Sequence, residues 1–102
     1  MVVELLSDEE LGAMQNRLLE NPEAGEVIIG SGGMRKLRVA LRGRGKRGGA
    51  RVIYYRFTER QQILLLLIYD KSRADDLTAD QKRALGLLVE EEKLSETTAK
   101  EK

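Results

Sequence analysis

A two-stranded hairpin is predicted near the middle of the chain by the stretch Gly30-Ser-Gly-Gly-Met-Arg-Lys-Leu-Arg-Val-Ala-Leu-Arg-Gly-Arg-Gly-Lys-Arg-Gly-Gly-Ala-Arg-Val-Ile-Tyr-Tyr55. In residues 35–42 apolar side chains alternate with mostly basic ones, which is the period of a half-buried strand with a cationic exposed face. Residues 43–49 are rich in glycine and suit a long hairpin loop. Residues 50–58 are rich in β-branched and aromatic side chains, so we expect a second strand there, antiparallel to the first.

The same stretch concentrates the positive charge of the chain. From Met34 to Arg60 there are ten Lys and Arg residues and one acid, Glu59, which gives a net charge of +9. The whole chain has 18 basic and 17 acidic residues, so the remainder has 8 basic and 16 acidic residues, a net charge of -8. A concentrated cationic surface attracts polyanions and releases their counterions on binding. Nucleic acid is therefore the first class of partner that the sequence suggests.

The composition also limits the chemistry. The 102-residue chain has no cysteine and no histidine, which removes disulfides, thiol nucleophiles and the usual acid–base group at neutral pH. An enzyme built on this chain must use Lys, Arg, Tyr, Asp or Glu, and we expect neither a metal nor another cofactor. The longest apolar run, residues 63–69, is too short to span a bilayer, and the N-terminus lacks the pattern of a signal peptide. We expect a single-domain, soluble, intracellular protein that does not contact membranes.

Two helices are predicted at the ends of the domain. Ser7 and Glu10 stand three residues apart, as in a capping box, and are followed by an apolar stripe at helical spacing, so a helix is expected over 8–20. Thr78 and Gln81 repeat this signature before a second stripe, which predicts a helix over 79–93.

A third strand is predicted over residues 63–69, which have no polar face and so suit a central strand covered on at least part of both sides. A helix is the alternative for this run, which is short and bounded by turns. The order of elements predicts an α+β fold, in which an antiparallel sheet has both helices packed on one face. The other face would be open and would present the Lys and Arg side chains. We expect the domain to occupy residues 1–94, followed by a flexible tail over 95–102.

Four ordered motifs resemble the RelE/HigB branch of the toxins of bacterial toxin-antitoxin systems. They are Gly30-Ser-Gly-Gly-Met-Arg-Lys-Leu-Arg38, Gly45-Lys-Arg-Gly-Gly-Ala-Arg-Val-Ile-Tyr-Tyr55, Leu66-Leu-Ile-Tyr-Asp-Lys71 and Asp76-Leu-Thr-Ala-Asp-Gln81. The resemblance covers about residues 5–93 and implies a microbial-RNase-like fold that cleaves mRNA in the ribosomal A site. It also implies neutralisation by a cognate antitoxin, often a helix-turn-helix protein of the HigA type. The toxin would contact operator DNA only through this antitoxin.

The resemblance implies that four basic residues form the catalytic group. Lys36 and Arg38 fall on the first basic strand of the motif, Arg51 follows its glycine-rich loop, and Lys71 follows its apolar strand. RNA supplies its own nucleophile, the 2′-hydroxyl, so the protein must only orient it, move protons and stabilise the developing charge. Like charges favour the loss of a proton from a lysine, which makes Lys36 or Lys71 a candidate for proton transfer, whereas Arg38 and Arg51 suit phosphate clamps. Lys36 and Arg51 are both expected on an exposed strand face.

Further residues are predicted to contact RNA or the ribosome, and they are Arg35, Arg42, Arg44, Lys46, Arg47, Tyr69 and Arg73. The alternative for the basic stripe is a solvated strand face, and for Lys46 and Arg47 a solubilising loop tip. The tyrosines are also typical of core or rim positions, with Tyr69 the best candidate for stacking on a base. Asp70 and Asp76 are expected to be turn and cap residues.

The chain departs from the family pattern at its N-terminus. Family members usually have a longer leader with a first strand, whereas only residues 1–6 precede the first helix cap here. We therefore expect that edge strand to be short or missing and the sheet to have three strands. Two other functions stay open at this point. One is a catalytically silent nucleic-acid-binding homologue that acts as a corepressor with its antitoxin, and the other is a ParE-like gyrase inhibitor.

Overall fold

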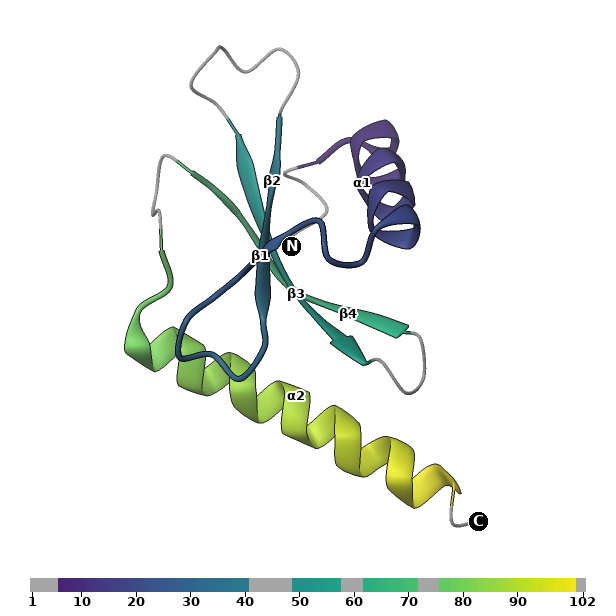
Figure 1. Ribbon diagram of the computed structural model, residues 1–102, viewed down its shortest axis with the longest axis vertical. Helices are drawn as coiled ribbons and strands as arrows, with labels where there is room; N and C mark the ends of the chain where they lie inside the picture. The colour runs from purple at the N-terminus through teal and green to yellow at the C-terminus, as the bar shows by residue number, and fades with distance from the viewer. Residues whose placement is uncertain (1–5, 41–48, 58–61, 72–75, 101–102) are drawn as a thin grey trace.

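The computed structural model describes residues 6–40, 49–57, 62–71 and 76–100, and for residues 95–100 it describes the backbone alone. Four strands form one antiparallel sheet in the order β1-β2-β3-β4, with a helix before it and a helix after it in the chain (Figure 1). The elements are α1 (Asp8–Glu20), β1 (Glu26–Val27), β2 (Arg35–Val39), β3 (Ala50–Phe57), β4 (Gln62–Asp70) and α2 (Ala79–Lys100). The α+β class and the antiparallel sheet are confirmed, but the sheet has four strands instead of three.

Both helices begin at the predicted capping boxes. The Ser7 hydroxyl accepts a hydrogen bond from the Glu10 backbone N–H at 3.1 Å, and the Glu10 carboxylate accepts one from the Ser7 N–H at 2.9 Å. Thr78 and Gln81 make the same two bonds at 3.1 and 2.9 Å. These bonds satisfy backbone amides that have no partner within the helix. The end of α2 was predicted wrongly, because the helix continues from residue 93 to Lys100 and so includes most of the expected tail.

A short hairpin before β2 was not predicted. β1 pairs with β2 through Glu26 opposite Lys36 and Val27 opposite Arg35. The turn between them has positive φ at Gly30, Gly32 and Gly33 (76°, 80° and 111°), a backbone conformation that glycine adopts without strain. A strand of two residues is too short to show an alternation of apolar and polar side chains, so it could not be predicted from the sequence.

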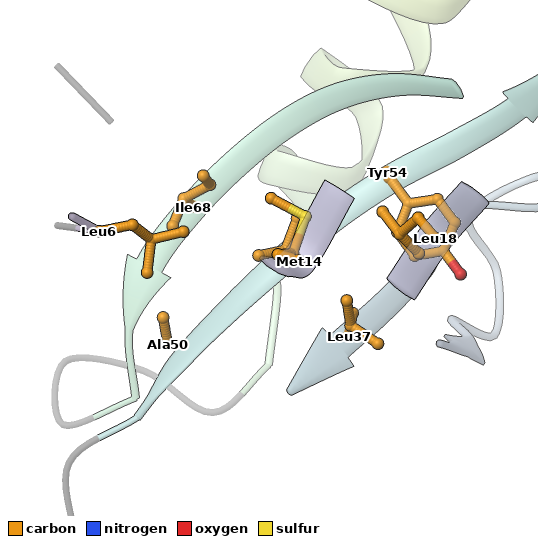
Figure 2. Close-up of a cluster of buried hydrophobic side chains, with 8 residues drawn as sticks. Leu6, Met14, Leu18, Leu37, Ala50, Tyr54 and Ile68 are labelled. Atoms are coloured by element: carbon orange, nitrogen blue, oxygen red, sulfur yellow. The ribbon is translucent and has the colours of Figure 1, made fainter. Parts of the chain in front are cut away.

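The helices pack against opposite faces of the sheet. On one face, α1 contributes Met14 and Leu18 to a buried cluster that also contains Leu6, Leu37, Ala50, Val52, Tyr54 and Ile68 (Figure 2). On the other face, Leu85 of α2 packs in a second cluster with Met34, Ile53 and Leu77. Val52 and Ile53 are neighbours on β3 and point to opposite faces, which separates the two clusters. The prediction of both helices on one face was therefore wrong, and α2 covers part of the face that was expected to be open.

β4 lies at an edge of the sheet, not at its centre as predicted. Its register with β3 shifts between Ile53, which is opposite Leu67, and Tyr54, which is opposite Leu65. The extra residue, Leu66, packs with Leu67 against the α2 cluster, whereas Leu65 packs against the α1 cluster. Because a helix lies on each side, an edge strand needs apolar residues on both faces, and this explains the run without a polar face.

The segment before β1 is anchored to the middle of the sheet. The Tyr54 hydroxyl donates to the Pro22 carbonyl oxygen at 2.7 Å and accepts from the Gly25 N–H at 2.9 Å. A Cβ at Gly25 would lie 2.8 Å from the Tyr54 ring and 2.9 Å from the Lys36 carbonyl oxygen, so only glycine fits. This contact holds the segment against β2 at Lys36.

Candidate nucleic-acid interface

One shallow hollow of about 250 Å³ is lined by four cations and one carboxylate. Its lining residues are Lys36, Arg38, Arg51, Lys71 and Asp76. Lys36 and Arg38 come from β2, Arg51 comes from β3, and Lys71 directly follows β4. The four residues predicted as a catalytic group are thus brought together from three strands.

Two arginines on neighbouring strands lie opposite each other in this hollow. Arg38 of β2 is directly opposite Arg51 of β3, and like charges in that relation destabilise a sheet. Arg51 is only 7% exposed, so the prediction that it lies on an exposed strand face was wrong. Within the described part of the chain its guanidinium donates to the Ala50 carbonyl oxygen at 3.3 Å, a bond that brings no opposite charge. An anion between the two arginines would remove their repulsion.

The end of the β3–β4 hairpin brings Lys71 to the same place. The Lys71 N–H donates to the Gly49 carbonyl oxygen at 2.9 Å, which continues the strand pairing by one step beyond β4. Tyr69 is opposite Arg51 in the register, so Lys71, two residues later, has its side chain on the same face of the sheet. Lys71 is exposed and lines the hollow.

Lys36 has an acidic partner that the sequence did not reveal. Its ammonium nitrogen lies 2.9 Å from Oδ1 of Asp76, in an ion pair whose side chains are 17% and 82% exposed respectively. The hydrogen bond and the positive charge of Lys36 lower the pKa of the Asp76 carboxyl below its usual value, with a smaller contribution from Lys82. Asp76 was expected to be a turn or cap residue. The helix cap is Thr78, and forty residues of sequence separation concealed the pairing with Lys36.

The other predicted binding residues are only partly brought to the hollow. Arg35 lies on the opposite face of β2 from Lys36, and its guanidinium donates to the Gly25 carbonyl oxygen at 2.7 Å. Tyr69 is half-buried and packs against the α2 cluster beside Arg51. The predicted contacts at Arg42, Arg44, Lys46, Arg47 and Arg73 lie outside the described residues.

No protein-family model matches the chain. Among the residues that the structure describes, acidic side chains do not gather in a group of three or more that could hold a metal ion. The described helices also include none with the length and apolar character needed to cross a membrane. The geometry of the cationic hollow is therefore the main guide to function.

Proposed function

We propose that this protein is a ribosome-dependent mRNA endonuclease that binds a backbone phosphate in the hollow between Lys36, Arg38, Arg51 and Lys71. The observation that carries this proposal is the direct opposition of Arg38 and Arg51, one of them buried, on a sheet face that also holds two lysines. Such an arrangement is costly unless an anion completes it.

The hollow matches the tasks of RNA cleavage. Arg38 and Arg51 present guanidinium groups, which stay charged and bind phosphate oxygens in pairs of hydrogen bonds. They would hold the scissile phosphate and stabilise the negative charge that grows on it in the transition state. The ammonium groups of Lys36 and Lys71 would add positive charge to the hollow and supply protons. The 2′-hydroxyl of the RNA would be the nucleophile, and none of these steps requires a metal ion.

The resemblance to RelE/HigB toxins gives the proposal its biological setting. It supports mRNA in the ribosomal A site as the substrate and a cognate antitoxin, of the helix-turn-helix type, as the inhibitor. The net charge of +9 between Met34 and Arg60 suits docking on ribosomal RNA. The bacterial cytoplasm is the compartment in which this activity would operate.

The test is a reconstituted translation reaction with a defined mRNA and the purified protein. Primer extension should reveal breaks within translated codons, and no breaks when ribosomes are omitted. Arg38→Gln should abolish them, because the exposed Arg38 side chain is removed from the hollow without loss of core packing. Arg56→Gln is the matched control, since Arg56 lies on the next strand but forms its ion pair with Glu23, at 3.4 Å, outside the hollow.

Two results would contradict the proposal. Growth arrest on expression with intact mRNA and damaged DNA would indicate gyrase inhibition instead. RNA binding by the wild-type protein with no breaks under any condition, together with tighter operator binding by its antitoxin, would indicate a silent corepressor.

A further inference from the structure

The carboxylate of Asp76 lines the cationic hollow, and anchored residues follow it in the chain. The next residue, Leu77, is buried in the cluster with Met34, Ile53 and Leu85, and Thr78 caps α2. Both anchors lie within two residues of Asp76 on its C-terminal side. The side chain is nevertheless 82% exposed, and a substrate in the hollow has direct access to it.

Asp76 is the one acceptor-only group among the described residues that line the hollow. Lysine and arginine in their charged forms carry only donors, so they cannot take a proton from a hydroxyl. Asp76 pairs with Lys36 on β2, and the hydrogen bond and charge of Lys36, with a smaller contribution from Lys82, lower the pKa of its carboxyl below the usual value. A carboxylate beside a phosphate site adds nothing to binding, because it repels the phosphate. The ion pair with Lys36 accounts for its position, and its acceptor oxygens suit it to proton transfer.

We propose that Asp76 is the general base that takes the proton from the attacking 2′-hydroxyl, and that Lys36 is its partner acid. This assignment rests on the proposed endonuclease function and adds the residue that the four cations leave out. The 2.9 Å distance between Asp76 Oδ1 and Lys36 Nζ places the base and the acid in direct hydrogen-bond contact.

The reaction balances with these two groups alone. The 2′-O–H bond breaks and its proton passes to Asp76 Oδ2, while the 2′-oxygen forms a bond to phosphorus. The bond from phosphorus to the 5′-oxygen breaks, and Lys36 Nζ gives a proton to that oxygen. The products are a 2′,3′-cyclic phosphate and a 5′-hydroxyl. Rotation of the protonated Asp76 carboxyl group then brings its O–H to the neutral Lys36 Nζ, and transfer of the proton to that nitrogen restores both groups.

The test compares the cleavage and RNA affinity of three purified full-length variants with those of the wild type. Asp76→Asn removes the base and keeps the shape, and Asp76→Glu keeps a carboxylate. Asp80→Asn is the matched control, because Asp80 is also an exposed acid near the start of α2 but pairs with Arg83 at 2.8 Å, outside the hollow. Cleavage is the single-turnover rate on ribosome-bound mRNA. Affinity is measured with a 2′-O-methylated RNA oligonucleotide, which has no nucleophile and cannot be cleaved.

We expect Asp76→Asn to slow cleavage by about 100-fold or more, the usual effect of losing a general base. Its affinity for the methylated RNA should be equal to or tighter than that of the wild type, because a repulsive charge has gone. Asp76→Glu should cleave faster than Asp76→Asn, and Asp80→Asn should match the wild type. All three variants should unfold thermally in one transition close to that of the wild type.

Three results would overturn the assignment. Wild-type cleavage by Asp76→Asn with tighter binding would mean that Asp76 is only an internal counter-ion of Lys36. Slow cleavage with weaker binding would mean that it only positions Lys36 for the phosphate. Absence of cleavage by the wild type itself would contradict the proposed function, and this assignment with it. The other two results require cleavage by the wild type, so the two kinds of failure can be distinguished.

Discussion

At the scale of single residues, the Tyr54 hydroxyl joins the segment before β1 to the sheet beneath the candidate site. We predict that Tyr54→Phe lowers the free energy of unfolding by about 1–3 kcal/mol, because it leaves the Gly25 N–H and the Pro22 carbonyl oxygen without their buried partner. Chemical denaturation followed by circular dichroism measures this loss. Tyr55→Phe is the control, since Tyr55 and its partner Lys93 are both only half-buried, so the loss of the Tyr55 hydroxyl leaves no buried backbone group without a partner. Equal losses in the two variants would contradict the argument.

The Lys36–Asp76 ion pair should also be visible in the titration of Asp76. Because Lys36 lowers the pKa of this carboxyl in the folded state, the pair stabilises the fold above the ordinary Asp value of 3.8. That stabilisation is lost as the pH falls through the lowered folded pKa. We predict that the side-chain carboxyl carbon of Asp76 titrates below pH 3.8 by NMR, and that Lys36→Met moves the midpoint upward. An unchanged midpoint in Lys36→Met would mean that the ion pair does not form in solution.

At the scale of elements, α2 is held on the sheet by one side of the helix. Leu85 is 8% exposed and packs in the cluster with Ile53, whereas Leu87, two positions later, is 64% exposed. We predict that Leu85→Ala lowers the free energy of unfolding by about 2–5 kcal/mol, through lost burial and the cavity that remains. Leu87→Ala should change it by no more than about 0.5 kcal/mol. Urea denaturation of both variants tests this, and similar losses would place α2 in a different orientation.

At the scale of the whole molecule, the separation of charge should govern RNA binding. Single-stranded RNA releases about 0.7 counterions for each phosphate that a protein neutralises, so affinity should fall steeply with salt. We predict that Arg38→Gln weakens binding of the 2′-O-methylated oligonucleotide and reduces the slope of log affinity against log salt by about 0.7. Anisotropy titrations at several salt concentrations measure the slope. Arg56→Gln should leave it close to the wild-type value, and an equal decrease in both variants would indicate diffuse attraction instead of a defined phosphate site.

The sequence by itself determined the local structure, because capping boxes and alternation act over a few neighbouring residues. The start of both helices, the extent of α1 and the three longer strands follow from such signals, as Ser7 with Glu10 and Thr78 with Gln81 show. The basic strand face was also visible, since Lys36 and Arg38 flank the buried Leu37 within one strand.

Only the tertiary structure decided how these elements meet. Periodicity identifies the apolar side of a helix but not the face of the sheet on which that side packs, so the placement of α1 and α2 on opposite faces could not be predicted. The edge position of β4 could not be predicted either, because the pattern of one strand does not give the strand order. The same holds for the burial of Arg51 and for the contact of Asp76 with Lys36, which depend on strand register and on where α2 begins. Contacts between residues far apart in the chain form only when packing brings them together, and no local pattern records them.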